Sequence, residues 1–198
     1  MKALLILGMQ NDFMPGGALS VPDAESLIPL INALIPKFSL VIAVQDWHPA
    51  DHVSFASNHL GKHPGEIVMV KGHEQALWPP HCVQDTHGAA LVDGLHKDKI
   101  ERVFYKGTDA EVGSYSAFFD NARENGTGLG DYLLERQVKE LTIVGVGTEY
   151  SVLYSAWDAT DLGFSVIVIK SACRGINLKP RDVENAYLAM KAKGASVI

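Results

Sequence analysis

The segment KALLILGMQNDF, residues 2–13, decides the fold class. It opens with an apolar run at residues 3–7 and breaks into polar residues at 10–12. A continuously apolar run without alternation is typical of a central strand in a parallel sheet that helices cover on both faces. The run is too short for a secretory signal peptide, and no small-residue cleavage site follows it. We therefore expect a buried first strand.

Further runs of the same kind follow, and helical patterns separate most of them. The expected strands lie at residues 39–44, 102–105, 140–146 and 164–169, with a candidate sixth at 195–198. The expected helices lie at residues 26–34, 130–136, 151–162 and 180–193. Alternating strands and helices imply right-handed crossovers. The sequence therefore predicts an α/β fold with a doubly wound, Rossmann-like parallel sheet.

Length, charge and cysteine content narrow the class of protein. A chain of 198 residues suits a single domain, which we expect to span residues 1–198. The net charge of −6 and the lack of a Lys/Arg run argue against nucleic-acid binding. No apolar stretch reaches the roughly 18 residues of a membrane span. The only two cysteines, Cys82 and Cys173, fit a reducing compartment, so we expect a cytoplasmic protein.

The excursion at residues 46–98 shows little helical or strand periodicity, and it contains all eight histidines. A connection of this length without regular structure is uncommon in a compact domain and usually serves a function. We expect it to cover the carboxyl edge of the sheet, where ligands bind in open α/β folds.

A carboxylate and two imidazoles in this excursion are candidate metal ligands. Asp46 and His48 follow the second expected strand, and His81 ends the stiff segment WPPH at residues 78–81. A carboxylate with neutral imidazoles suits zinc, iron or manganese. Alternatively, Asp46 caps a turn and the histidines are solvated. The sequence indicates that four other histidines lie at the surface, namely His52, His59, His63 and His73.

Two further features point to the same edge. Lys106 leaves the third expected strand, where it could stabilise an anion or pair with a carboxylate; alternatively, it reaches out to solvent. The segment 145–151, GVGTEYS, runs from the fourth strand into a helix. Its backbone N–H groups could form an oxyanion hole, or Thr148 could cap an ordinary helix start.

Five separated segments resemble those of nicotinamidases and pyrazinamidases, a branch of the isochorismatase-like hydrolases. They appear in that family's order from residue 3 to the C-terminus, at residues 10–19, 45–49, 78–84, 104–107 and 172–175. The resemblance implies the isochorismatase-like fold, a six-stranded parallel sheet flanked by helices. It also implies hydrolysis of nicotinamide to nicotinate and ammonia through a cysteine acyl-enzyme, within NAD salvage.

The resemblance also implies roles for individual residues. A divalent metal, zinc or else iron or manganese, would be held by Asp46, His48 and His81, with Glu74 as a candidate fourth ligand. Such a metal orients the pyridine ring of a small carboxamide ligand. Phe13, Trp78 and Tyr150 correspond to the aromatic pocket. Gly147 and Ser151 correspond to the oxyanion hole, beside a cis peptide bond at Val146–Gly147. A homo-oligomer is compatible with this family.

Two of the three catalytic positions depart from the family pattern. The aspartate that acts as base corresponds to Gly8, and the nucleophilic cysteine corresponds to Ser151; Lys106 alone remains. Glycine offers no proton acceptor, and a serine hydroxyl needs a base more than a thiolate does. Lys106 is expected to lack a carboxylate partner. Asp12 and Glu149 are the nearby acids, although both match structural positions of the family.

Three hypotheses follow from these departures. The sequence favours a scaffold that keeps the metal and pyridine pocket but has strongly impaired catalysis, a candidate pseudoenzyme. A second hypothesis is an active nicotinamidase that uses Ser151 with an unrecognised base. The remaining alternative is a different hydrolase activity on the same scaffold, or a sequence altered in the laboratory at these positions.

Overall fold

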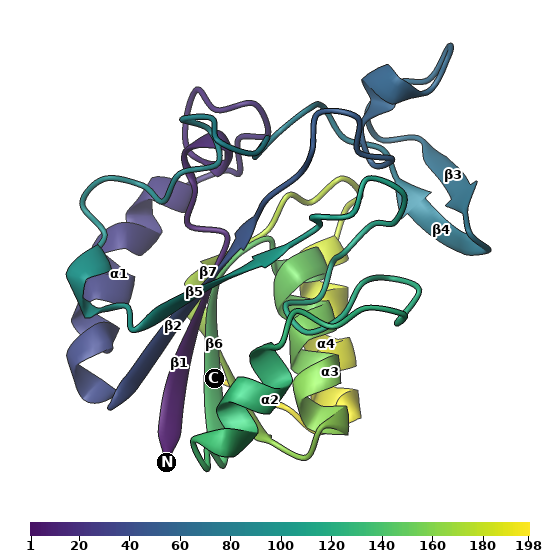
Figure 1. Cartoon of the computed structure of the whole chain (residues 1–198). Coiled ribbons are helices and arrows are strands. Elements are labelled where there is room, and N and C mark those ends of the chain that lie inside the picture. Colours follow the sequence, from purple (N-terminus) through teal and green to yellow (C-terminus); the bar gives the residue numbers. More distant parts are fainter.

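A six-stranded parallel sheet forms the centre of the computed structural model, which describes residues 1–198 (Figure 1). The strands are β1 (Lys2–Leu7), β2 (Leu40–Asp46), β5 (Arg102–Lys106), β6 (Glu140–Val146), β7 (Ser165–Arg174) and β8 (Ser196–Val197). Their order is β5-β2-β1-β6-β7-β8, and every neighbouring pair is parallel. The predicted doubly wound α/β fold is confirmed. The order turns back at β1, which places a crevice between the carboxyl ends of β1 and β6.

Helices cover both faces of the sheet (Figure 1). One face carries α1 (Leu27–Leu34), and the other carries α2 (Leu129–Glu135), α3 (Leu153–Asp161) and α4 (Asp182–Lys193). Because both faces are covered, two apolar cores form, one of 18 buried residues beside α1 and one of 25 beside the other helices. This explains why β1 and β2 read as continuously apolar runs.

Several strands run further than the sequence predicted. β2 continues through Gln45 to Asp46, β5 continues to Lys106, and β7 reaches Arg174. The prediction ended each strand at its last apolar residue. Gln45, Asp46 and Lys106 are nevertheless buried, because the excursion closes over the carboxyl edge of the sheet.

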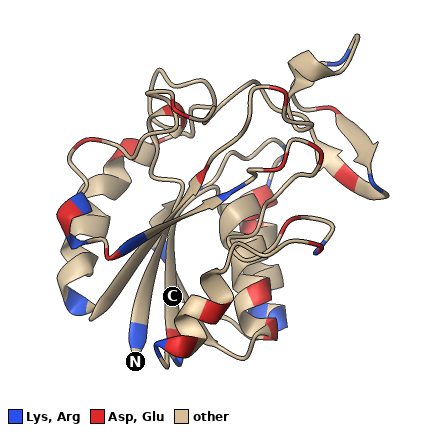
Figure 2. Ribbon diagram, in the orientation of Figure 1, with Lys and Arg blue, Asp and Glu red and all other residues tan.

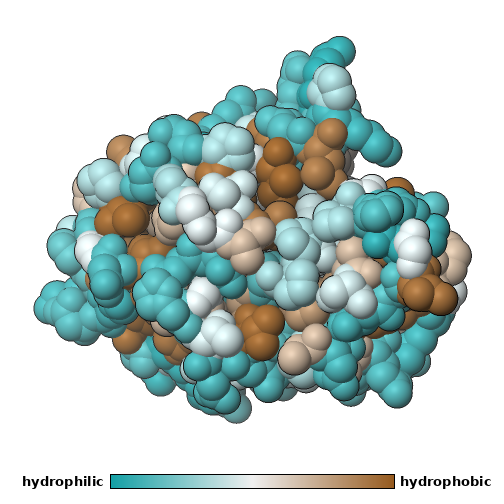
Figure 3. All heavy atoms as spheres, turned by 90° about the horizontal axis from the view of Figure 1, so that it is seen from above, coloured by the Kyte–Doolittle hydropathy of each residue, from teal (hydrophilic) through white to brown (hydrophobic).

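The excursion contains a β-hairpin that periodicity did not reveal. β3 (Ile67–Val70) pairs antiparallel with β4 (His73–Ala76), and the hairpin projects from the body of the molecule (Figure 1). Lys71 and Gly72, which join them, both have positive φ, as a type I′ turn requires. Figure 3 views the molecule from above and shows hydrophobic residues gathered beside a segment that projects from the body.

The connection after β6 differs in detail from the expected helix at residues 151–162. Thr148–Val152 form a single π-helical turn, η6, and α3 begins only at Leu153. The peptide bond between Val146 and Gly147 is cis, as the resemblance implied.

Charged side chains are spread over the fold. Lys and Arg lie scattered among Asp and Glu along the ribbon (Figure 2). No helix combines the length and apolar character needed to cross a membrane.

Candidate functional site

The ends of β2 and β5 set the centre of the site. Asp46 and Lys106 are register partners on these neighbouring parallel strands, so their side chains extend from the same edge of the sheet. Nζ of Lys106 lies 2.8 Å from Oδ1 of Asp46, and both side chains are almost fully buried. Nζ also donates a hydrogen bond of 2.8 Å to the carbonyl oxygen of Ser114. The sequence expectation that Lys106 lacks a carboxylate partner is therefore wrong, because a neighbouring strand supplies one.

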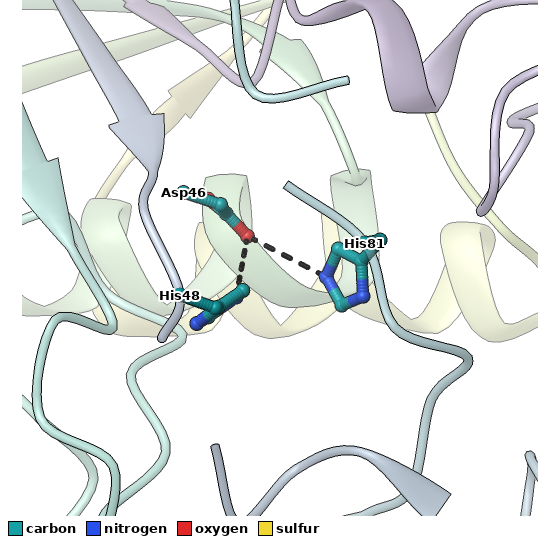
Figure 4. Close-up of side chains that lie close together, drawn as sticks. All are labelled: Asp46, His48 and His81. Carbon is teal, nitrogen blue, oxygen red and sulfur yellow. Dashed lines mark ion pairs between the residues drawn. The ribbon is translucent and has the colours of Figure 1, made fainter. Parts of the chain in front are cut away.

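Asp46, His48 and His81 form a buried group whose candidate ligand atoms all lie within 4.8 Å of one another. Oδ2 of Asp46 lies 3.6 Å from Nε2 of His48 and 4.0 Å from Nε2 of His81. Both imidazoles converge on this carboxylate (Figure 4). These residues could hold a metal ion.

The remaining ring nitrogens fit a metal-binding role. Nδ1 of His48 lies 2.9 Å from the carbonyl oxygen of Gly107, and Nδ1 of His81 lies 2.8 Å from that of Pro79. A carbonyl oxygen only accepts hydrogen bonds, so each Nδ1 carries the proton and each Nε2 presents a lone pair toward the centre. Metal-binding histidines are commonly oriented by such bonds. One carboxylate and two neutral imidazoles make a donor set that suits zinc.

Electrostatics keep Asp46 and His81 in the protonation states that metal binding needs. Burial, together with neighbouring His48, lowers the pKa of His81 from 6.5 to about 4. Burial opposes ionisation of Asp46, but Lys106 and the imidazoles outweigh it and hold the pKa of Asp46 below its ordinary value. At neutral pH the group therefore holds a carboxylate beside a neutral His81.

Glu74, the candidate fourth ligand, is not part of this group. It lies on β4 with its side chain exposed, and the buried metal-ligating group comprises Asp46, His48 and His81 alone. Side chains alternate along a strand, so burial of Gln75 turns Glu74 away.

His52, expected at the surface, is completely buried. Its ring lies 4.3 Å from that of His48, centroid to centroid. Nδ1 lies 2.7 Å from Oγ of Ser54, and Nε2 lies 3.1 Å from the carbonyl oxygen of Val112. No local pattern indicates this burial, because Val112, which closes over the ring, lies 60 residues further along the chain. His52 packs against His48, one of the candidate metal ligands.

Nearly all of the predicted site residues line a single pocket. It adjoins the metal group, Lys106, Gly147 and Ser151. Its aromatic side chains are Phe13, Trp78, Tyr115 and Tyr150. The rings of Trp78 and Tyr150 meet edge to face, with centroids 5.0 Å apart. Gly8 and Glu74 are the two predicted residues that do not line the pocket.

Gln10 and Ser114 were not among the sequence candidates. Nε2 of Gln10 donates to the carbonyl oxygen of Asp46, and its Oε1 accepts from the amide of Asp46, both at 2.8 Å. Gln10 therefore fixes the backbone that carries a metal-ligand candidate. The available signal was its position three residues beyond the end of β1, next to buried Met9.

Ser151 has no base beside it. It lies in η6, and its hydroxyl makes no side-chain hydrogen bond. Position 8 has no side chain, and Gly8 has a left-handed backbone with φ of 61°. A Cβ atom placed on Gly8 would lie 2.8 Å from the carbonyl oxygen of Val146. The end of β1 is therefore shaped around glycine.

The two nearby acids serve other contacts. Oδ2 of Asp12 accepts from the amide of Cys82 at 2.7 Å, and Oδ1 accepts from the amide of Ala18 at 3.2 Å. Oε1 of Glu149 accepts from the amide of Asn177 at 2.5 Å, and burial raises the pKa of Glu149. Neither residue lines the pocket that contains Ser151.

Acidification is expected to destabilise the metal-free protein through its buried histidines. Burial lowers the pKa of His52 to about 3 and that of His81 to about 4, from 6.5 in the unfolded chain. The unfolded state therefore binds more protons, so stability is fully present above roughly pH 6.5 and falls as the pH drops toward the folded pKa values. Urea unfolding should show a loss of roughly 2 kcal/mol or more between about pH 7.5 and about pH 5.

His52→Gln should flatten that dependence, whereas the same change at exposed His63 should not. Stability that rises or stays level on acidification would contradict the assignment of these two histidines as buried and neutral.

The fold and the site define an α/β protein with a carboxylate–imidazole group beside an aromatic pocket at the carboxyl edge of its sheet. The isochorismatase domain family matches residues 2–198, and the chain belongs to this family.

Its relatives within the family include several nicotinamidases. The chain is 45% identical over 200 residues to the nicotinamidase of Escherichia coli, covering 99% of this chain and 93% of that protein. It superimposes on yeast nicotinamidase bound to the inhibitor nicotinaldehyde with a TM-score of 0.94, 34% identity and coverage of 100% and 99%. For the Pyrococcus horikoshii pyrazinamidase in complex with zinc, the TM-score is 0.81, the identity 37% and the coverage 100% and 98%. The chain therefore has a nicotinamidase-family scaffold.

Proposed function

We propose that this chain binds a divalent metal and a small pyridine ligand in its pocket, and that its hydrolysis of pyridine carboxamides is strongly impaired. The observation that carries this proposal is the isolation of Ser151. Its hydroxyl has no hydrogen-bond partner, and the position that holds the family's base is Gly8.

The binding half of the proposal rests on the buried ligand group. Asp46, His48 and His81 point their free donor atoms at one another, and backbone carbonyls hold both imidazoles in place. A relative with 37% identity is described in complex with zinc, and another with a pyridine inhibitor. When bound, a metal would supply a Lewis acid that attracts the lone pair of a ring nitrogen.

The aromatic side chains would hold the ring. Trp78 meets Tyr150 edge to face, and the ring of Phe13 lies 5.7 Å from that of His81. Planar walls beside a metal group fit a flat heteroaromatic ligand. The amide N–H groups of Gly147 and Ser151 would contact its carbonyl oxygen, as in the family's oxyanion hole.

There is a chemical reason to expect that hydrolysis by Ser151 is strongly impaired. A serine hydroxyl attacks a carbonyl only when a base removes its proton, and a positioned base contributes about 10²–10⁴ in rate. Neither Asp12 nor Glu149 lines the pocket that contains Ser151. No observation therefore favours an active enzyme with a substitute base. Because losses within a triad are not additive, we expect turnover at least roughly 10³-fold below that of an intact relative.

Ammonia release from nicotinamide tests this proposal. The zinc-reconstituted chain and the Escherichia coli relative would be assayed side by side, with the metal content of both measured. Turnover within roughly tenfold of the relative would overturn the proposal. A chain that binds neither zinc nor any pyridine ligand would overturn its binding half.

A further inference from the structure

The two edges of the β3–β4 hairpin differ in their cover. On the β4 edge, the amide of Ala76 donates to the hydroxyl of Tyr115 at 3.1 Å, and Nε2 of Gln75 donates to the same hydroxyl at 3.2 Å. These contacts attach β4 to the body of the molecule. β3 pairs with β4 alone, so the outer edge of β3 has no partner strand.

The register of the hairpin shows which backbone groups this free edge presents. The two-residue turn joins Val70 to His73, and hydrogen bonds close such a pair. Bonded and non-bonded pairs alternate along an antiparallel ladder, so Val68 also bonds to β4. The N–H and C=O groups of Ile67 and Met69 therefore point away from β4, and no hydrogen bond from another segment reaches them.

The free edge is also apolar and uncharged. β3 reads IVMV, without a charged residue or a proline. Proteins commonly protect an exposed edge with such residues, because an open edge is a template for another strand. The side chains of Ile67 and Met69, which share one face of the strand, are 51% and 65% exposed. The edge is therefore suited to pair with a further strand.

We propose that β3 pairs antiparallel with β3 of a second copy of this chain, so that the two hairpins form one continuous sheet about a two-fold axis. An axis through Val68 places Ile67 opposite the partner's Met69. Each such pair exchanges N–H···O bonds in both directions, since these are the residues whose backbone groups face outward. The arrangement is self-complementary, as a two-fold interface requires.

The charges that flank β3 favour a second copy as the occupant of this edge. Glu66 precedes the strand and Lys71 follows it. In the antiparallel register, Glu66 lies one position from the partner's Lys71, whereas the two Glu66 residues are separated by the length of the strand. Opposite charges therefore meet at both ends of the interface. The present ion pairs of these residues, with Lys62 and Glu111, are exposed and give way at little cost.

The body of the molecule offers apolar cover to the partner strand. Ile67 borders a hollow of about 460 Å³ between the hairpin and α4, and Leu153, Leu178 and Ala186 also line it. Opposite residues of an antiparallel pair project from the same face of the sheet. The partner's Met69 therefore lies on the side of this hollow, and its flexible side chain can adapt to it.

Sedimentation equilibrium of the zinc-reconstituted chain tests the proposal. At roughly 100 µM the chain should show the mass of two copies, and the mass should fall toward that of one copy on dilution. The mass of a single chain at that concentration would overturn the proposal and leave the edge to an extended peptide of another protein.

Amide hydrogen exchange distinguishes this interface from any other. The N–H groups of Ile67 and Met69 should exchange roughly tenfold or more slowly in the paired state than after dilution. Those of Val68 and Val70, which bond to β4, should be protected similarly at both concentrations. A dimer in which Ile67 and Met69 exchange freely would show that the two copies meet elsewhere, and the proposal would be wrong.

Variants at Met69 test the same edge. Met69→Pro removes an outward N–H and no bond to β4, and proline is tolerated at such edge positions. Met69→Lys places a charge in the centre of the interface. Each should weaken association by roughly tenfold or more. Leu134→Lys changes an exposed leucine of α2, far from the hairpin, and should leave association unchanged (Figure 1).

Undiminished association in both folded Met69 variants would contradict the pairing. If neither variant folds, the exchange of Ile67 and Met69 in the unmodified chain still decides between the two outcomes.

Discussion

Replacing Asp46 with alanine is expected to lower zinc affinity by more than about 100-fold and to destabilise the metal-free protein by about 3–5 kcal/mol. The first effect follows from the loss of the only carboxylate in the ligand group. The second follows from Lys106, whose ammonium would stay buried after losing its partner at 2.8 Å. One substitution therefore weakens both metal binding and the fold.

Competition with a chromogenic chelator measures the zinc affinity, and urea unfolding measures the stability. Asp51→Ala removes an exposed acid five residues further along the chain and should change neither quantity. Asp46→Asn keeps the shape of the side chain and serves if the alanine variant does not fold. Undiminished zinc affinity in both Asp46 variants would refute the assignment of this ligand group.

The sheet could be predicted from the sequence because its strands are buried on both faces. A run such as residues 2–7 leaves few alternatives, since its side chains need apolar cover on each side. The β3–β4 hairpin could not be predicted from the sequence, because only Gln75 is buried among its eight paired residues. Without a buried face, neither strand shows the alternation that reveals a strand.

The metal group could be anticipated in part from local order. Asp46 and His48 follow a strand, and a stiff proline segment delivers His81. The contact between Lys106 and Asp46 could have been inferred too, since both residues end strands expected at the same sheet edge. The resemblance points elsewhere, because it pairs this lysine with the family's base position, which is Gly8 here. The burial of His52 depends on Val112, which no local pattern indicates.

The double variant Gly8→Asp with Ser151→Cys is expected to release ammonia from nicotinamide about 10²–10⁴-fold faster than the unmodified chain. It returns a proton acceptor and a strong nucleophile together. Each single change should gain much less, because the members of a triad act as a unit. A gain of similar size from Ser151→Cys alone would show that another group already acts as the base.

The Gly8→Asp substitution is also expected to destabilise the protein. Gly8 has φ of 61°, and a Cβ atom there would meet the carbonyl oxygen of Val146 at 2.8 Å. Aspartate tolerates the left-handed region better than most residues, but the close contact requires the end of β1 to shift. Gly8→Asp should therefore lower the free energy of unfolding by about 1–3 kcal/mol.

A matched control separates the chemistry from the strain. Gly16 also has positive φ, but it is exposed and has open space around it, so Gly16→Asp with Ser151→Cys adds the same atoms outside the pocket. This control should gain no activity beyond that of Ser151→Cys. If the Gly8 double variant stays equally inactive while its zinc content and fold are intact, the missing side chains do not account for the impairment. The conformation of β1 at Gly8 would then be the obstacle, and the pocket would have been reshaped around another ligand.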